Sequence, residues 1–475
     1  MKSSIRSLIL ALVGLALVVS LSSAPHPALA VDDPPANPAG GDHPLYLPLA
    51  MKNSPYYTLF GAETGGLSVQ RVEQFKELRL SWVRTFAFSW AEIEPQSKTP
   101  REYDWSKVDE AGLAAAAANQ QLVIAIVKDT PAWARKTPGY ICSAPASDKI
   151  DEYAAFLKAI VTRYSPGPYG LRYLELGNEV DVDPRLVWPE APYGCWGDID
   201  NNYYGGGYYA EILRQAYPAI KSANPEVQVL TAGLLLDCDP TNTRVACDAG
   251  KYLEGILRAG GGAFFDILSY HAYPRFESPN VIGESVASWN PRGGMYVGKI
   301  AFIRAMLSKY GLNKPLMLTE ASLVCPEYLS ECKQDSPKYG TFLDLQADYV
   351  YWTFVRAYVY NIQAVIWYTY EDSGWRSSGL FEDGAAKPAY YAYQYLSNLL
   401  YEATYSRTIT SYPGVAAYEF RDVGRRLWIL WASDQVSHSV TLPTGVIAIY
   451  DKFGVQLPTA GAITVKSPVV VVLQP

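Results

Sequence analysis

Two short stretches decide the fold: Leu-Glu-Leu-Gly-Asn-Glu-Val at 174–180 and Leu-Met-Leu-Thr-Glu-Ala at 316–321. Each is an apolar run of strand length that delivers a glutamate, Glu179 in the first and Glu320 in the second. A (β/α)₈ barrel builds its active site from side chains at the C-terminal ends of its parallel strands. Paired carboxyl groups are the groups that cleave glycosidic bonds. The two stretches therefore predict a barrel with catalytic glutamates at 179 and 320.

The sequence around these stretches alternates between short apolar runs and longer helical patterns, which is typical of βα units and a parallel sheet. We predict an α/β fold, a (β/α)₈ TIM barrel over residues 56–400. A doubly wound open sheet is the main alternative, but no Gly-x-Gly-x-x-Gly follows an early strand. The eight predicted strands are Thr58–Gly61, Trp82–Phe86, Leu122–Val127, Tyr173–Leu176, Val227–Ala232, Ile267–Tyr270, Leu316–Thr319 and Ala364–Tyr368.

The two ends of the chain differ from this pattern. Residues 1–30 combine Lys2 and Arg6 with an apolar run and a final Ala-Leu-Ala, which predicts a cleaved secretory signal peptide; an uncleaved membrane anchor is the alternative. Residues 31–55 form a Pro/Gly-rich linker. Short β-rich runs separated by turns predict a small antiparallel, β-sandwich-like domain over residues 401–475. We therefore expect a secreted protein with no membrane segment after cleavage.

Composition excludes several classes of partner and site. The formal net charge is −7 and no basic run is present, which argues against nucleic-acid binding. The six cysteines all follow the signal, as expected in an oxidising compartment. Six cysteines allow fifteen pairings; closeness in sequence favours Cys238–Cys247 and Cys325–Cys332, which leaves Cys142–Cys195. No Cys-x-x-Cys occurs, so a zinc site is not expected.

At these motifs the chain resembles the clan-A retaining glycoside hydrolases, over roughly residues 56–400. Asn178-Glu179 matches the clan's Asn-Glu at strand four, and Thr319-Glu320 matches its nucleophile at strand seven. The resemblance implies that Glu179 is the acid/base and Glu320 the nucleophile, with Asn178 hydrogen-bonded to the sugar 2-hydroxyl. The mechanism requires a raised pKa at Glu179 and a low pKa at Glu320.

Other positions match the clan one at a time. Arg84 matches an arginine beside the nucleophile, and His271 and Tyr273 match a His-x-Tyr whose tyrosine hydrogen-bonds the nucleophile. Trp367 matches a tryptophan whose ring lies beneath the bound sugar. Trp133 lies in a loop that resembles a loop of the clan, and it is predicted to line the cleft. Glu175 is expected to be structural. Candidate substrate contacts that also follow strands are Glu63, Glu371 and Asp372.

Within the clan, the chain is most similar to the family of β-xylosidases, α-L-iduronidases and exopolysaccharide endo-hydrolases, with cellulase-like endo-glucanases nearly as similar. Gly177 and Val180 stand where that family has tryptophan and proline. The resemblance implies a retaining hydrolase acting on β-glycosidic bonds of oligo- or polysaccharides without cofactor or metal. Alternatives are a catalytically inactive carbohydrate-binding barrel and a transglycosylase using the same site. A serine hydrolase is disfavoured because no Gly-x-Ser-x-Gly occurs.

Overall fold

The computed structural model of the protein describes residues 58–242, 247–278, 281–283, 288–371, 375–459 and 461–475. The predicted signal peptide (1–30), the linker (31–55) and the candidate contact Asp372 lie outside these residues. Among the described residues, no helix combines the length and the apolar character needed to cross a membrane.

All eight predicted strands form, and they make one parallel sheet in the order β5-β4-β3-β2-β1-β10-β9-β6. Isolated parallel bridges from Leu230 to Ile267 and from Leu234 to Tyr270 join the two ends of this sheet, so the sheet closes into a (β/α)₈ barrel. Its strands are β1 (Phe60–Thr64), β2 (Trp82–Ser89), β3 (Leu122–Lys128), β4 (Tyr173–Leu176), β5 (Gln228–Leu230), β6 (Leu268–Ala272), β9 (Leu316–Ala321) and β10 (Ala364–Trp367).

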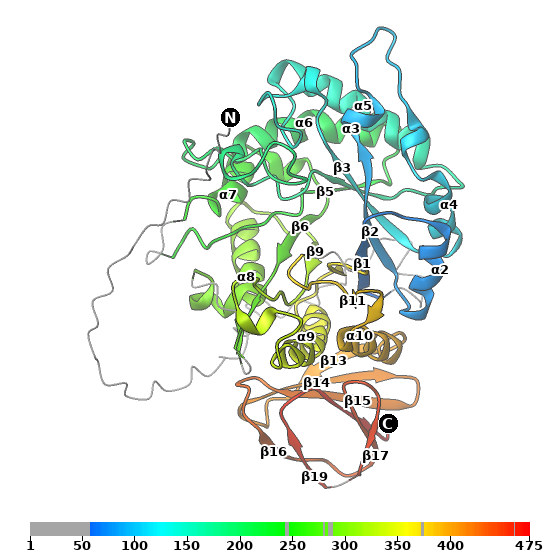
Figure 1. Cartoon of the computed structure of the whole chain (residues 1–475), viewed down its shortest axis with the longest axis vertical. Helices are drawn as coiled ribbons and strands as arrows, with labels where there is room; N and C mark the ends of the chain where they lie inside the picture. The colour runs from blue at the N-terminus through cyan, green and yellow to red at the C-terminus, as the bar shows by residue number, and fades with distance from the viewer. Residues whose placement is uncertain (1–57, 243–246, 279–280, 284–287, 372–374, 460) are drawn as a thin grey trace, which may run out of the picture. The chain divides into compact units, whose positions relative to one another are not determined.

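Helices lie around the strands (Figure 1). The helical patterns in the sequence predict most of them, because apolar residues recur at helical spacing and face the sheet; α5, for example, buries Tyr153, Phe156 and Ile160. The helices are α2 (Val69–Glu77), α3 (Trp90–Ile93), α4 (Glu110–Ala118), α5 (Ile150–Tyr164), α6 (Gly206–Ala223), α7 (Lys251–Arg258), α8 (Gly294–Lys309), α9 (Tyr339–Val359) and α10 (Pro388–Leu399).

The barrel interior has an apolar layer near the N-terminal ends of the strands, where Trp82 of β2 and Tyr173 of β4 pack edge to face with ring centroids 4.8 Å apart. Side chains two positions apart on a strand point to the same face. Arg84 and Glu175, two residues beyond this aromatic pair, therefore also point into the barrel, and both are fully buried. The alternation of side chains along the strands thus places Arg84 and Glu175 next to the apolar layer, on its side nearer the C-terminal ends of the strands.

The C-terminal β domain is antiparallel, as predicted. A six-stranded sheet contains β13 (Thr404–Thr408), β14 (Val415–Asp422), β15 (Arg425–Ala432), β17 (Val446–Asp451), β18 (Gln456–Leu457) and β20 (Val469–Leu473), and a second sheet pairs β16 (His438–Thr441) with β19 (Ala462–Val465). The domain lies against α9 and α10 (Figure 1). Lys452 donates to Asp344 and Asp348 of α9, at 2.6 Å to one carboxylate oxygen of each. Small β domains gain stability from such packing.

The three predicted disulfides form: Cys142–Cys195, Cys238–Cys247 and Cys325–Cys332. Cys142 follows β3 and Cys195 follows β4, so this bond ties together two loops at the C-terminal end of the barrel.

Candidate active site

Arg84 lies at the centre of a buried charged cluster. Its guanidinium contacts Glu63 and Glu320 through Nη1, while Nε donates to Glu175 at 2.7 Å. Nη2 donates to the Oδ1 of Asn178, also at 2.7 Å. Burial disfavours the charged guanidinium, but Glu175, Glu63 and Glu320 outweigh it and raise the pKa of Arg84, so the residue remains a cation.

Glu175 and Glu63 are thus both partners of Arg84. Glu175 is fully buried and also accepts a hydrogen bond of 3.0 Å from Thr319, which agrees with the structural role expected for it. Burial raises the pKa of Glu63. Glu371 lies in a separate group, where it accepts from Thr64 and Thr369.

Glu179 sits on a tight turn just after β4. Its φ is +47° and its backbone N–H donates to Ala232 at 2.8 Å. Gly177 has a φ of +106°, a conformation open to glycine, and a Cβ placed there would lie 2.4 Å from the Cγ1 of Val180. The Gly177 and Val180 that depart from the family pattern are therefore complementary: the valine fills the space that a side chain at 177 would need.

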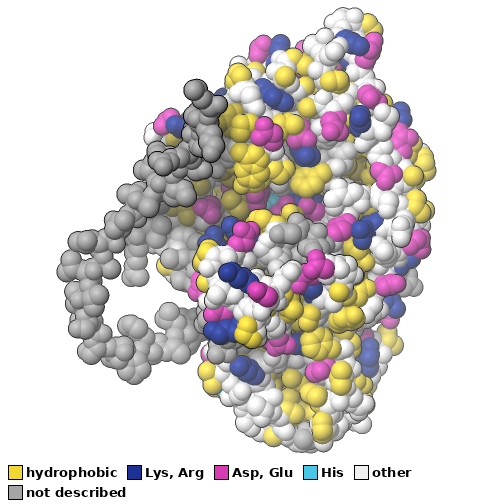
Figure 2. All heavy atoms as spheres, viewed as in Figure 1, with side chains coloured by type: hydrophobic (Ala, Val, Ile, Leu, Met, Phe, Trp, Pro, Cys, Tyr) yellow, Lys and Arg dark blue, Asp and Glu magenta, His cyan; other side chains and the backbone are white. Residues whose placement is uncertain are grey.

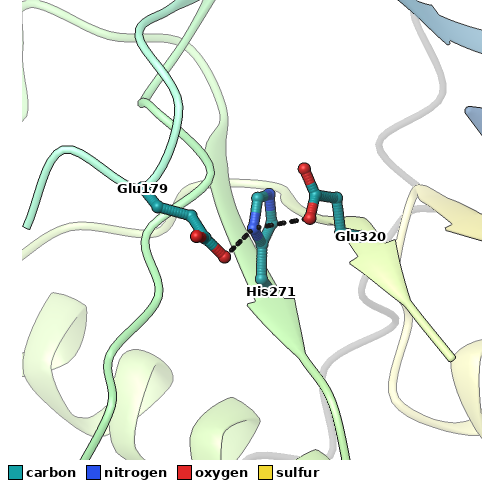
Figure 3. Close-up of side chains that lie close together, drawn as sticks. All are labelled: Glu179, His271 and Glu320. Atoms are coloured by element: carbon teal, nitrogen blue, oxygen red, sulfur yellow. Dashed lines mark hydrogen bonds and ion pairs between the residues drawn. The ribbon is translucent and has the colours of Figure 1, made fainter. Parts of the chain in front are cut away.

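His271, at the end of β6, lies between the two predicted catalytic glutamates (Figure 3). Its Nδ1 is 2.8 Å from an oxygen of Glu179 and 3.3 Å from an oxygen of Glu320. Burial, together with the charges of Arg84 and Lys299, lowers the pKa of His271 well below its usual value. The imidazole is therefore neutral, so its contact with Glu179 is a hydrogen bond rather than an ion pair, and Glu320 lies close to the same nitrogen.

Glu320 is held on both of its carboxylate oxygens. Arg84 contacts Oε1, and the hydroxyl of Tyr273 donates to Oε2. Burial raises the pKa of Tyr273, so its hydroxyl keeps the proton that it donates. Thr319 and Glu320 are consecutive, yet both reach this cluster; a register shift in the β6–β9 pairing accounts for this, since a bulge re-aims a side chain.

The two glutamates differ in electrostatic environment. Burial raises the pKa of Glu179 well above its usual range, and the carboxylates of Glu320 and Asp181 raise it further. Burial also raises the pKa of Glu320, but Arg84 and Tyr273 oppose that shift. The low pKa expected for Glu320 is thus not found, because the carboxylate is buried; the cation and the hydroxyl limit the rise rather than reverse it.

In a hollow of the surface, acidic side chains and a histidine are visible, with hydrophobic side chains gathered around the rim (Figure 2). Aromatic rings form part of the site. Tyr273, Tyr368 and Trp375 lie mutually edge to face, with ring centroids 5.0 to 5.8 Å apart. Tyr368 is partly exposed. Burial raises the pKa of its hydroxyl, and the nearby charges of Glu320 and Glu179 raise it further. Sequence reasoning missed Tyr368, which directly follows the predicted platform residue Trp367.

Two predicted aromatic contacts are placed differently from the prediction. Trp367 has no exposed surface, and its indole N–H donates to Ser378 at 3.1 Å, so its ring is part of the barrel core rather than a floor open to a sugar. Trp133 is partly buried beside Trp90, with an N–H donated to the carbonyl of Glu94 at 3.1 Å. The structure gives it no contact with Glu179 or Glu320. Asn178, Arg84, His271 and Tyr273, by contrast, are brought together with the two glutamates.

No family model matches the chain, and no curated protein matches it. Solved structures do. A family 39 glycoside hydrolase from Bacteroides cellulosilyticus WH2 is 17% identical with a TM-score of 0.65, covering 88% of this chain and 81% of that one. A GH30 endoxylanase from Clostridium papyrosolvens C71 is 16% identical with a TM-score of 0.55, covering 88% and 97%. A glucosidase from Croceicoccus marinus is 13% identical with a TM-score of 0.54, covering 87% and 95%.

The chain has the fold of these hydrolases. At these identities the similarity shows the fold, which is the barrel predicted from the two glutamate-bearing stretches. The three solved structures described above are glycoside hydrolases by their descriptions, in agreement with the resemblance of the motifs.

Glu179, His271 and Glu320 also offer one nitrogen and two oxygens within 4.8 Å of one another, a spacing that a metal ion could use. A ligating histidine normally donates its second ring N–H to an acceptor. Here the Nε2 of His271 has no partner among the described residues, and it lies against Gly233, where a Cβ would be 2.3 Å away. The guanidinium on Glu320 also disfavours a second cation. The donor set therefore fits a hydrogen-bonded carboxyl pair better than a metal.

Proposed function

We propose that the protein is a secreted retaining glycoside hydrolase that cleaves β-glycosidic bonds of oligo- or polysaccharides, with Glu179 as acid/base and Glu320 as nucleophile. One observation carries the proposal: one carboxylate oxygen of Glu179 and one of Glu320 lie within 4.8 Å of each other. Retaining enzymes hold their two carboxyl groups about 5–5.5 Å apart, whereas inverting enzymes leave about 6.5–9.5 Å for a water.

In the first step Glu320 attacks the anomeric carbon, and Glu179 gives its proton to the departing oxygen. The raised pKa of Glu179 supports this role, because the residue must be protonated at the start. The glycosyl–enzyme ester then removes the charge of Glu320, which is one cause of that raised pKa. The pKa of Glu179 falls as a result, and the residue can take a proton from the water that releases the sugar.

The remaining residues bind and orient. The amide nitrogen of Asn178 has no partner among the described residues and is available to a sugar hydroxyl, while its oxygen is fixed by Arg84. The partly exposed ring of Tyr368, rather than Trp367, is suited to lie against a sugar face. Secretion is supported by the leader-like residues 1–30 and by three disulfides.

The test is hydrolysis of a panel of aryl glycosides and β-linked polysaccharides, with products resolved by size and by anomeric configuration. The proposal expects release with retention, and loss of at least about 10³-fold in kcat for Glu320→Ala. Azide should rescue the two variants differently: Glu320→Ala should form a glycosyl azide of inverted configuration, and Glu179→Ala one of retained configuration. Inversion by the wild type, or near-normal turnover of Glu320→Ala, would refute the assignment. If acceptor sugars are added, transfer of the glycosyl group to them would identify a transglycosylase. Inactivity on every compound would indicate a barrel that binds carbohydrate without cleaving it.

A further inference from the structure

A buried lysine and a buried aspartate both hydrogen-bond to the peptide group that joins Leu235 and Leu236, and we call this arrangement the Leu235 clamp. Lys299 of α8 is 1% exposed, and its Nζ donates to the carbonyl of Leu235 at 2.6 Å and to that of His271 at 2.8 Å. Asp181 is also 1% exposed, and its carboxylate accepts from the N–H of Leu235 at 2.9 Å and of Leu236 at 2.8 Å. Both ends of residue 235 are thus held by ionisable side chains.

This clamp joins the two elements that carry the Glu179–His271 hydrogen bond. Asp181 lies two residues beyond Glu179 on the same turn, and Glu179 itself donates its N–H to Ala232 of the following segment. Lys299 ties that segment to the backbone of His271. The turn at 179–181, the segment at 232–236 and the end of β6 are therefore linked through hydrogen bonds that are buried or partly buried.

We infer that Lys299 and Asp181 are positioning residues for Glu179: they fix the Leu235 peptide between the turn of Glu179 and the strand of His271, and so set the contact between these two side chains. This inference rests on the proposed function for its catalytic meaning. Burying two ionisable groups is costly, and a hydrophobic residue would fill the space of Lys299 at lower cost. Apolar side chains, however, could not hold the two carbonyls.

The two charges also act on Glu179 with opposite sign: the carboxylate of Asp181 raises its pKa and the ammonium of Lys299 lowers it. Burial lowers the pKa of Lys299 to about 8, so its charge acts on Glu179 mainly below that pH. Other titratable or charged groups also contact Glu179 or interact with it electrostatically. They are Glu320 on β9, Arg84 on β2, His271 on β6, and Tyr193, Tyr273 and Tyr368 on adjoining loops.

The test titrates the Glu179 carboxyl by ¹³C NMR in the intact protein, with the signal assigned through Glu179→Gln. Lys299→Met should raise the Glu179 midpoint by about half a unit or more, and Asp181→Asn should lower it by a similar amount. Lys314→Met is the matched control, because Lys314 is a partly buried lysine that donates to the carbonyl of Phe265 at 2.8 Å, just before the N-terminal end of β9. It should leave the midpoint unchanged.

A kinetic readout separates positioning from folding. On aryl glycosides that the wild type cleaves, Lys299→Met should slow substrates with poor leaving groups about tenfold more than those with good ones, because only the former need a well-placed acid. Lys299→Arg, which keeps the charge and donors, should restore most of the difference. Shifts of the same sign in Lys299→Met and Asp181→Asn, or no shift beyond the Lys314→Met control, would overturn the inference. If the midpoints move as stated but no glycoside is cleaved, the positioning of Glu179 stands and the proposed hydrolase function fails.

Discussion

The Nη1 of Arg84 donates to both Glu63 and Glu320, so two carboxylates share one nitrogen of one cation. Glu320 raises the pKa of Glu63, and the effect between two charges is mutual. Glu63→Gln replaces the carboxyl group that competes with Glu320 for this nitrogen by a weaker, neutral acceptor, and should therefore lower the pKa of Glu320. Since Glu320 must be ionised to attack, we expect the acid limb of the kcat/KM–pH profile to move to lower pH. A shift to higher pH would contradict the coupling.

Even a conservative substitution of Arg84 should lower the activity of the enzyme. Arg84→Lys keeps the positive charge but not the planar fork that reaches Glu175, Asn178 and Glu320 together. We expect kcat/KM to fall about 10²-fold or more, with the acid limb moved to higher pH as Glu320 loses its donor. Circular dichroism and thermal melting of the variant separate this effect from unfolding. Activity within a factor of about two of the wild type would rule out the role given to the guanidinium.

The turn of Glu179 should depend on glycine at 177. Gly177→Ala adds a Cβ in a left-handed conformation and against Val180, so we expect a loss of about 2 kcal/mol in unfolding free energy and lower activity. Gly139→Ala is the control: Gly139 has a φ of +89° but no atom within 4 Å of an added Cβ. Denaturant titration should show the smaller cost, about 1 kcal/mol, for the control. Equal losses would mean that the contact with Val180 is unimportant.

Tyr368 and Trp367 should differ in what they contribute. Tyr368→Ala is expected to lower kcat/KM by about tenfold with little loss of stability, because its partly exposed ring faces the site. Trp367→Ala removes a fully buried ring and should instead destabilise the fold by about 3–5 kcal/mol. Thermal melting and initial rates of both variants check this. The reverse pattern would restore Trp367 as the platform.

Lys452 should stabilise the contact between the β domain and α9. Its side chain is 6% exposed and that of Asp348 is 7% exposed, so Lys452→Met leaves a buried carboxylate without its cation. We expect a loss of about 3 kcal/mol in unfolding free energy. Lys338→Met, which breaks the exposed pair with Glu331, should cost less than about 1 kcal/mol in the same denaturant titration. Similar losses in both would show that the buried pair adds nothing.

The strands and the two glutamates were predictable because both signals are local. Apolar runs give the strands, and the predicted strand Tyr173–Leu176 has the bounds that the structure has. The role of Glu63 and the position of Tyr368 were not predictable in this way. The first depends on the register between β1 and β2, which places Glu63 beside Arg84. The second depends on how the chain leaves β10, where a shift of one residue decides whether a side chain lies in the core or in the site.

Short edge elements were missed for a related reason. The strand Ala462–Val465 buries only Val465, and the helix Val69–Glu77 buries only Val72 and Phe75, so neither carries a long apolar pattern. The disulfides were paired correctly from sequence closeness alone for two of them; the third followed by elimination. Burial, which sets the pKa of Glu320, could not be inferred from the sequence, since it depends on the depth of the barrel end.

Three carboxylates, Glu63, Glu175 and Glu320, contact the guanidinium of Arg84 at this end of the barrel, and a fourth, Glu179, lies within range of its charge. An inhibitor with a basic ring nitrogen would carry into the pocket the positive charge that these residues lack. Its affinity should grow with pH as Glu179 and Glu320, whose pKa values are raised, ionise, until the inhibitor itself loses its proton. A neutral ring of the same shape should show no rise of affinity with pH. The excess of carboxylates over cations in this pocket should therefore favour ligands that carry a positive charge.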